Sequence, residues 1–281
     1  MNFLKIPFTL AFIMFLTSSC NNMFYYPDKR MLINPEKAGY KQELITFYSK
    51  DNTELKGWFF KSKTTPVKGT IIHYHGNAEN ISTHFLFSAW LTEMGYNLFI
   101  FDYRGYGQSK GVISREGAHQ DAISAYKYAV ANFYKKDQKL ILFGQSLGGA
   151  ILLGSFGDLK SLSPISAIII ESSFYSYQEV VRDKFSNIWL TWPFQHLAYL
   201  LFSDDYSPEG NINKISPIPL LVIHGNKDRV VPIKFGKFIF DKAKEPKEFW
   251  EVKNGGHTGA FLNKDNTYRK KLIDYLDNLP K

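Results

Sequence analysis

The chain has 281 residues, 44% of them hydrophobic and 21% charged, which is the composition of a globular protein and excludes intrinsic disorder. This length suits one large α/β domain or two small ones. The formal net charge is +8, but Lys and Arg are spread in short runs. The charge therefore favours a solvated basic face with no nucleic-acid partner, and it leaves open a weak attraction to anionic lipid headgroups.

Residues 1–20 are typical of an export signal. Lys5 precedes an apolar run over residues 6–16, which is too short to span a bilayer comfortably, and three small residues follow. Cys20, the only cysteine, comes next and resembles the lipidated cysteine of bacterial lipoproteins, although Leu16 lies one position earlier than usual. The resemblance implies an exported protein anchored to a membrane of the cell envelope through Cys20. A plain secretory signal and an uncleaved membrane anchor are the alternatives.

The mature chain alternates strand and helix patterns after a polar tether and entry segment over residues 21–43. Apolar runs predict strands at 44–48, 55–60, 69–75, 96–102, 140–143, 167–170, 220–223 and 248–252. Helical spacing covers residues 85–94, 116–133, 147–156, 235–243 and 268–279. The alternation predicts an α/β fold whose mostly parallel central sheet has helices on both faces, with an antiparallel hairpin at one edge.

Residues 174–213 interrupt this alternation. They separate two predicted strands by far more than one helix requires, and they are rich in Phe, Tyr and Trp. We expect this insertion to form a helical cap over the site, within a domain that spans residues 44–281.

A Gly-Gln-Ser-Leu-Gly motif around Ser146 stands directly between a predicted strand and a predicted helix. In that context a serine sits on a sharp turn, where Gly144 and Gly148 avoid collisions and the helix N-terminus faces charge that forms at the serine. A glycine-rich turn with a capping serine is the alternative. The context favours Ser146 as a nucleophile.

A serine nucleophile requires a base and an acid, which follow it along the chain in the order acid, then histidine. Asp228 comes after the strand predicted at 220–223, and His257, in a glycine-rich loop, is the only histidine beyond it. Glu171, at the end of another strand, is the rival acid. The order and the loop favour Asp228, which leaves Glu171 as a structural carboxylate near the pocket.

The oxyanion of an acyl-transfer intermediate needs amide donors. We expect these to be the backbone N–H groups of Leu147 and Asn77, because Gly76 lets its loop turn tightly. His75 has no partner at metal-ligand spacing and is interpreted as a residue that shapes the loop. The glycines of loop 102–109 lack the partners of a phosphate site, so Arg104 is expected to form an ion pair there.

Together the motifs at 75–78, 102–109, 144–149, 224–232 and 256–257 resemble α/β-hydrolases of the membrane-associated serine esterase group, which includes depalmitoylases, lysophospholipases and monoacylglycerol lipases. The resemblance runs from about residue 24 to the C-terminus. It implies the triad Ser146, Asp228 and His257 and the oxyanion amides of Asn77 and Leu147. The cap has no recognisable motif, so the substrate stays open.

The sequence thus predicts a serine hydrolase that cleaves esters or thioesters of apolar, lipid-like acyl groups and needs no metal or organic cofactor. The alternatives are a serine peptidase of the prolyl-aminopeptidase type and an inactive membrane-anchored binding module. A peptidase would require an acidic anchor for the substrate amine, for which Glu79 and Glu171 are candidates.

Overall fold

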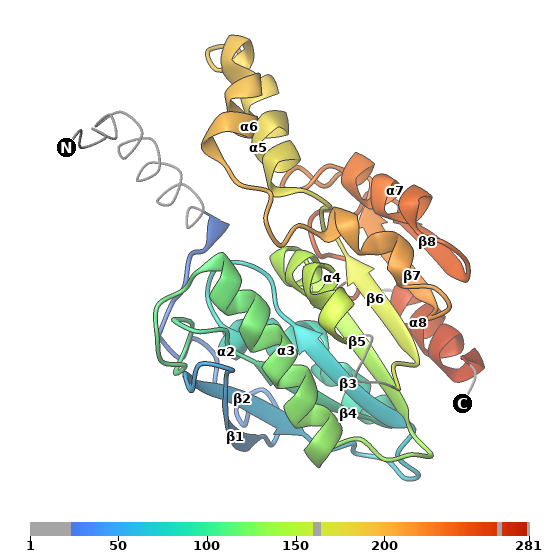
Figure 1. Ribbon diagram of the computed structural model, residues 1–281. Helices are drawn as coiled ribbons and strands as arrows, with labels where there is room; N and C mark the ends of the chain where they lie inside the picture. The colour runs from blue at the N-terminus through green and yellow to red at the C-terminus, as the bar shows by residue number, and fades with distance from the viewer. Residues whose placement is uncertain (1–23, 160–163, 263–265, 280–281) are drawn as a thin grey trace, which may run out of the picture.

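One eight-stranded sheet organises the protein, as a computed structural model describes it for residues 24–159, 164–262 and 266–279 (Figure 1). Its spatial order is β1-β2-β4-β3-β5-β6-β7-β8. β1 pairs with β2 and β2 with β4 in antiparallel fashion, and all other pairs are parallel. The strands are β1(Glu43–Tyr48), β2(Glu54–Phe60), β3(Gly69–Tyr74), β4(Tyr96–Phe101), β5(Lys139–Gln145), β6(Ala167–Glu171), β7(Leu220–Gly225) and β8(Lys247–Val252). This is the α/β-hydrolase fold expected from the sequence.

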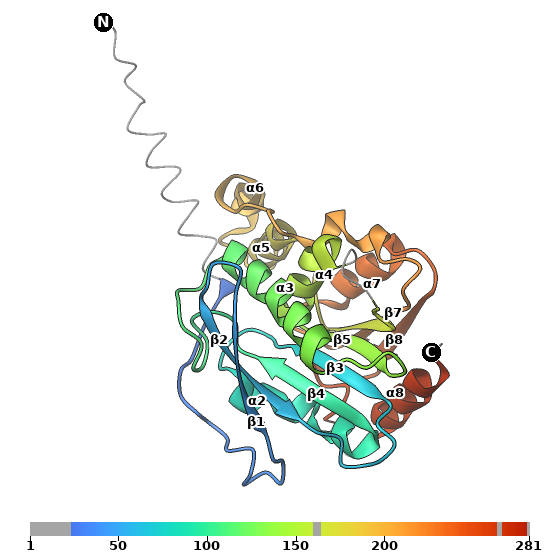
Figure 2. The same cartoon turned by 60° about the horizontal axis from the view of Figure 1, so that its bottom comes forward.

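Two hydrophobic cores cover the two faces of the sheet, because successive side chains of a strand point to opposite faces. One core joins the sheet to α3(Arg115–Asn132), α4(Leu147–Leu159) and α7(Ile233–Lys242). The other joins it to the segment before β4 and to α8(Thr267–Asn278). In β3, Ile72 belongs to the first core and Ile71 to the second. Figure 2 shows α3 and α4 lying across one face.

The helix expected over residues 85–94 differs from the prediction. The structure has a short α2(Ile81–His84) followed by two 3₁₀ segments, η2(Phe85–Phe87) and η3(Ala89–Met94). Polar side chains bond locally within these turns: Trp90 Nε1 donates to Phe87 O at 2.9 Å, and Thr92 Oγ1 donates to Ala89 O at 2.7 Å. Such local bonds compete with α-helical ones and favour the tighter turns.

The insertion between β6 and β7 projects beyond the carboxyl ends of the parallel strands (Figure 1). It consists of α5(Tyr177–Ser186), η5(Trp192–Leu197), α6(Ala198–Leu201), η6(Pro208–Gly210) and η7(Ile212–Lys214). α5 carries a capping serine, since Ser176 Oγ accepts from Glu179 N at 3.1 Å. The cap is therefore helical, as the sequence predicts.

The entry segment packs against the domain rather than hanging free. Tyr25 is buried in the core, and the Phe24 ring lies 5.0 Å from the Tyr177 ring of the cap. The export-signal expectation and Cys20 lie outside the described residues. Within the described ranges, no helix combines the length and apolar character needed to cross a bilayer.

Candidate active site

Ser146 occupies a strained turn between β5 and α4. Its φ angle is +50°, in a backbone region that residues other than glycine rarely adopt, and its side chain is half-buried. Two residues later, a Cβ on Gly148 would lie 2.1 Å from Tyr74 O and 2.3 Å from His75 O. Only glycine fits at this point, so the helix packs directly on the end of β3 and its N-terminus lies beside the serine.

The structure brings Ser146, His257 and Asp228 into one hydrogen-bonded chain. His257 Nε2 lies 2.9 Å from Ser146 Oγ, and His257 Nδ1 lies 2.8 Å from Asp228 Oδ2. An ionised carboxylate can only accept, so Nδ1 carries the proton and Nε2 is left to accept from the serine hydroxyl. The three residues come from the ends of β5 and β7 and from the loop after β8, which meet at the carboxyl edge of the sheet.

The Asp228 carboxylate is fixed by several donors. Oδ1 accepts from the backbone N–H groups of Val230 and Val231, both at 2.9 Å, and His224 Nε2 lies 3.4 Å from Oδ2. Burial alone would raise the pKa of Asp228, but the hydrogen bonds from His224, His257 and Val231 hold that pKa below its usual range. The carboxylate therefore stays ionised where it faces the imidazole.

His224 is a site residue that the sequence analysis missed. It is fully buried at the end of β7, and its Nε2 lies 2.7 Å from Val231 O, so it secures the loop that presents Asp228. Its position in the sequence could have indicated this role. A histidine that follows a buried strand directly and precedes the acid by four positions has few partners within reach except that loop.

Glu171 has a different environment. It is fully buried; Gln145 Nε2 donates to its Oε2 at 2.7 Å and Ala260 N donates to its Oε1 at 2.9 Å. Burial raises the pKa of the Glu171 carboxyl against the lowering effect of these bonds. The side chain thus ties β5 to the segment that follows His257, as expected of a structural carboxylate.

The two expected oxyanion donors lie on either side of Ser146. Leu147 is the first residue of α4, and a Cβ on Gly76 would lie 3.4 Å from Ser146 Cβ, which places the loop of Asn77 against the serine. Within the described part of the chain, neither backbone N–H donates to another group. Asn77 Oδ1 accepts from Tyr26 N at 2.9 Å, so the entry segment orients this loop.

His75 lies beneath the same loop. It is fully buried, its Nδ1 lies 2.8 Å from Gly76 O, and its Nε2 lies 3.6 Å from Asp102 Oδ1. Burial lowers the pKa of His75 and raises the pKa of Asp102 to about 7. The described residues contain no group of three or more His, Cys, Asp or Glu that could hold a metal.

Arg104 forms the ion pairs expected of it. Its guanidinium donates to Asp121 Oδ1 at 2.8 Å and to Asp51 Oδ2 at 2.8 Å, and Asp121 is fully buried. These bonds join the loop after β4 to α3 and to the hairpin turn. The loop therefore has a structural role.

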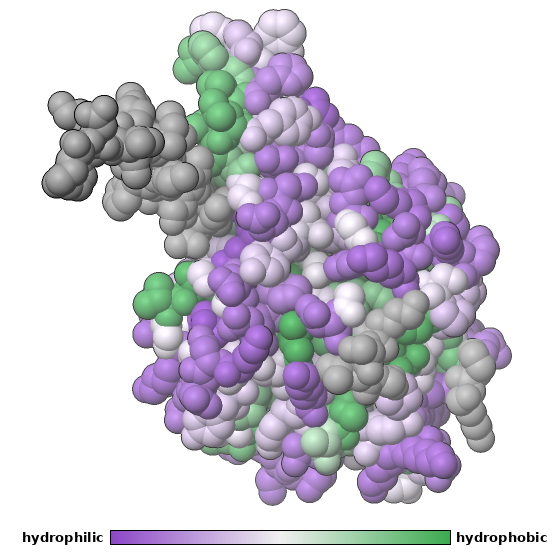
Figure 3. Space-filling view, viewed as in Figure 1, coloured by the Kyte–Doolittle hydropathy of each residue, from purple (hydrophilic) through white to green (hydrophobic). Residues whose placement is uncertain are grey.

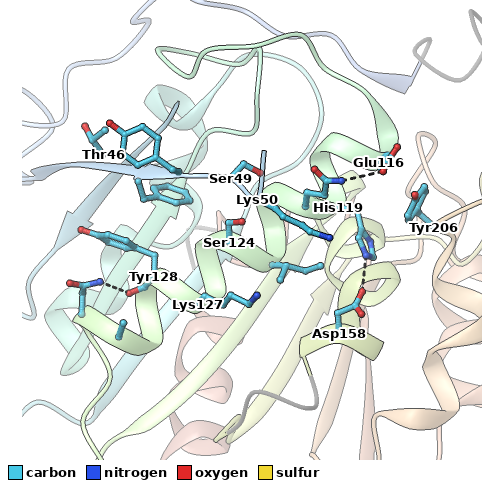
Figure 4. Close-up of a pocket in the computed structure, with 16 residues that line it drawn as sticks. Thr46, Ser49, Lys50, Glu116, His119, Ser124, Lys127, Tyr128, Asp158 and Tyr206 are labelled. Atoms are coloured by element: carbon cyan, nitrogen blue, oxygen red, sulfur yellow. Dashed lines mark hydrogen bonds and ion pairs between the residues drawn. The ribbon is translucent and has the colours of Figure 1, made fainter. Parts of the chain in front are cut away.

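His119 and Asp158 lie at one end of an open pocket of about 930 Å³ between β1 and α3 (Figure 4). Together with Ser155 of α4 they form a second serine–histidine–aspartate arrangement. His119 Nε2 is 3.0 Å from Asp158 Oδ2, and His119 Nδ1 is 3.1 Å from Ser155 Oγ. Ser155 is fully buried inside α4, and its hydroxyl donates to Ile151 O at 2.8 Å. No substrate carbonyl can approach this hydroxyl, so the arrangement is structural.

The comparisons with known proteins place the chain in a family. Residues 65–209 match the family model described as serine aminopeptidase, S33. The protein YfhR of Escherichia coli K12 is 38% identical over 278 residues, which cover 97% of this chain and 93% of YfhR. The chain belongs to the S33 family. A more distant relative, protein bem46 of Schizosaccharomyces pombe, is 27% identical over 201 residues, which cover 70% of this chain and 64% of bem46.

Solved structures agree on the fold. The esterase Pf2001 of Pyrococcus furiosus superposes with a TM-score of 0.71 at 17% identity, covering 91% of this chain and 98% of the esterase. The esterase domain of a Rhodothermus marinus protein gives a TM-score of 0.62 at 19% identity, covering 85% of this chain and 99% of that domain. This S33 member is therefore an α/β-hydrolase with esterases among its structural neighbours.

Proposed function

We propose that the protein is a serine esterase in which Ser146 is the nucleophile, His257 the general base and Asp228 the acid that orients the base. The observation that carries the proposal is the unbroken hydrogen-bond chain from Ser146 Oγ through His257 to Asp228, with distances of 2.9 and 2.8 Å. A serine hydroxyl within bonding distance of an oriented imidazole is the arrangement that nucleophilic acyl transfer requires.

The reaction begins when His257 Nε2 takes the proton of the Ser146 hydroxyl and the oxygen attacks the carbonyl carbon of the ester. The negative charge that forms on the carbonyl oxygen is stabilised by the N–H groups of Asn77 and Leu147. The imidazolium then protonates the leaving alcohol or thiol as the acyl–oxygen or acyl–sulfur bond breaks. Water that loses a proton to His257 then attacks the acyl-enzyme. The acyl–Oγ bond breaks, His257 returns that proton to Ser146 Oγ, and the acid is released.

The substrate class in this proposal is an ester or thioester of an apolar acyl group, of the kind cleaved by membrane-associated esterases. The aromatic cap beside the site supports it, since apolar walls favour an acyl chain. α5 reaches the acid loop directly: Lys184 Nζ donates to Arg229 O at 3.2 Å and to Val230 O at 2.6 Å. The cap therefore lies against the loop that carries Asp228.

An aminopeptidase is the second candidate, and the description of the family model favours it. Its substrate amine would need a carboxylate anchor. Glu171 is buried with both oxygens bonded inside the protein, and Glu79 is exposed in the loop after Asn77. Burial of Glu171 removes one of the two candidate anchors and leaves Glu79. An esterase needs no such anchor, so esterase activity is the stronger proposal.

Labelling with a fluorophosphonate probe tests the nucleophile. We expect the wild-type chain to be labelled and Ser146→Ala to be unlabelled. Ser155→Ala is the matched control, because Ser155 also lies beside a histidine but donates to a helix carbonyl, and we expect it to keep full labelling. An unlabelled wild-type chain would favour the inactive binding module, and labelling that persists in Ser146→Ala would disprove the assignment.

Substrate assays separate the two enzyme classes. We expect hydrolysis of p-nitrophenyl esters, with a preference for longer acyl chains. Hydrolysis of aminoacyl-arylamides without hydrolysis of short p-nitrophenyl esters would identify a peptidase instead.

We also propose that the chain is exported and held at a membrane of the cell envelope by a lipid on Cys20. The motif of residues 1–20 supports this placement. Metabolic labelling with a fatty acid in a bacterial host tests it, since the label should disappear in Cys20→Ser. Retained label in that variant would contradict the lipid attachment.

A further inference from the structure

The outer end of the cap exposes a group of large apolar side chains, which we call the cap-tip patch. Figure 3 shows hydrophobic residues gathered along this edge of the molecule. Trp189 is 86% exposed, Leu200 65% and Leu190 64%. The other members, all exposed, are Ile188, Trp192, Phe194, Leu197 and Tyr199.

The patch also lacks formal charge. Residues 187–201 contain no Asp, Glu, Lys or Arg, whereas charged residues make up 21% of the whole chain. Exposed large apolar side chains elsewhere in the described residues stand singly, such as Leu44 in β1 and Val112 in the loop before α3, or as the pair Met31 and Leu32. Contiguous apolar surface without charge marks a contact site, because its exposure to water is unfavourable.

The composition of the patch matches a membrane interface more closely than a protein partner. Tryptophan and tyrosine prefer the headgroup level of a bilayer, where the ring is buried and its polar atom stays hydrated. Leucine, isoleucine and phenylalanine between them supply the apolar area that enters the acyl boundary.

The position of the N-terminal segment supports the same partner. Phe24, the first described residue, packs on the cap through Tyr177 and Phe202, with ring centroids 5.0 and 6.0 Å apart. Arg115 lies over the Tyr177 ring at 3.8 Å and strengthens this joint. The chain that carries the apolar run of residues 6–16 therefore joins the folded domain at the cap.

The segment that joins the apolar run of residues 6–16 to Phe24 is short. Residues 17–23 can extend over at most roughly 25 Å, at about 3.5 Å for each residue. An N-terminus held in a bilayer by residues 6–16 or by Cys20 therefore keeps Phe24, and the part of the cap that Phe24 contacts, within that distance of the membrane surface. A second copy of the chain has no such reason to meet the patch.

We propose that the cap-tip patch docks into the interfacial layer of the lipid bilayer that holds the N-terminus. The docking is hydrophobic, since residues 187–201 carry no cation to attract lipid headgroups. It is therefore insensitive to salt and independent of anionic lipid, in contrast to adsorption driven by the net charge of +8. The proposal rests on the membrane attachment of the N-terminus proposed above and not on the catalytic assignment.

Tryptophan fluorescence of the full-length chain on phosphatidylcholine vesicles with brominated acyl chains tests the docking. The chain has five tryptophans, and Trp58, Trp90 and Trp250 are at most 6% exposed, so lipid quenching reports on Trp189 and Trp192. We expect vesicles to quench the emission and shift it to shorter wavelength, equally in low and high salt.

The variant Leu190→Asp/Leu200→Asp keeps both cap tryptophans and introduces two carboxylates into the patch. We expect it to lose the quenching and the shift while it still sediments with vesicles through its N-terminus. Val112→Asp is the matched control, since Val112 is 82% exposed outside the cap, and it should be quenched like the wild type. Circular dichroism checks that each variant is folded.

Three outcomes would overturn the proposal. The first is wild-type protein that sediments with vesicles but is not quenched. The second is equal quenching in the Leu190→Asp/Leu200→Asp variant. The third is a dimer that light scattering detects, that this variant abolishes and that lipid does not quench, which would assign the patch to a second copy of the chain.

Discussion

The contact between α4 and the end of β3 gives the sharpest test of how the fold positions the candidate nucleophile. Gly148→Ala adds one methyl group that would lie 2.1 Å from Tyr74 O and 2.3 Å from His75 O. Both neighbours are backbone atoms of a fully buried strand end, so neither can turn aside as a flexible side chain would. The helix must move instead.

The size of the effect follows from these distances. Real Cβ contacts essentially never fall below 3.0 Å, so α4 must shift by roughly 1 Å, and Ser146 and the Leu147 amide shift with it. Overpacking of this kind costs about 1–3 kcal/mol, which lowers the Tm by roughly 2–10 °C. A displacement of about 1 Å at the reacting atoms reduces kcat by about 100-fold.

The assay combines ester hydrolysis with thermal unfolding, and fluorophosphonate titration corrects kcat for the fraction of competent enzyme. Gly210→Ala is the control, because a Cβ there meets nothing within 4 Å, and we expect its rate and Tm to match the wild type. A Gly148→Ala enzyme with kcat within threefold of the wild type and an unchanged Tm would refute the reasoning.

Four further substitutions separate the roles of buried ionisable groups. Asp228→Asn should lower kcat by about 10⁴-fold, because the amide favours the wrong imidazole tautomer. Glu171→Gln should keep most of the activity. The reverse ranking of the two variants in ester hydrolysis would overturn the choice of acid. Asp102 keeps its proton up to a pH of about 7 in the folded chain but ionises near its ordinary pKa of 3.8 when unfolded, so the free energy of unfolding of the wild type falls as the pH rises through this range. Urea unfolding should show Asp102→Asn gaining stability over the wild type between pH 4 and 7, by at most about 1.4 kcal/mol for each pH unit. Arg104→Ala leaves the buried carboxylate of Asp121 without its guanidinium and should lower the unfolding free energy by about 3–5 kcal/mol.

An exposed group provides the control for these stability measurements. Arg30 pairs with Asp28 at 2.6 Å, but its side chain is 77% exposed, so Arg30→Ala should change the unfolding free energy by less than about 1 kcal/mol. An Arg104→Ala effect no larger than that of Arg30→Ala would contradict the importance of the buried pair. A flat pH profile for Asp102→Asn would contradict the protonated carboxyl.

Patterns of apolar residues along the sequence predicted most of the secondary structure. Buried strands are continuous apolar runs, so each strand boundary read from the sequence lies within two residues of the observed one. The segment at 85–94 differed because Trp90 and Thr92 bond to carbonyls three residues before them, and periodicity does not reveal whether a side chain turns back in this way.

The sequence by itself determined the fold class, the strand–turn–helix context of Ser146 and the order in which acid and histidine follow it. These are local properties: apolar periodicity, and glycines where a side chain would collide. Only the tertiary structure decided which carboxylate meets the imidazole, since Asp228 and Glu171 both end buried strands and differ in the donors that converge on them.

The packing of His224 beneath Asp228 and the exposure of the cap-tip patch were likewise settled only in three dimensions. Both depend on what lies within a few ångströms of a side chain, and in this fold those neighbours come from segments far apart along the chain. An apolar residue looks the same in the sequence whether other elements cover it or leave it facing water.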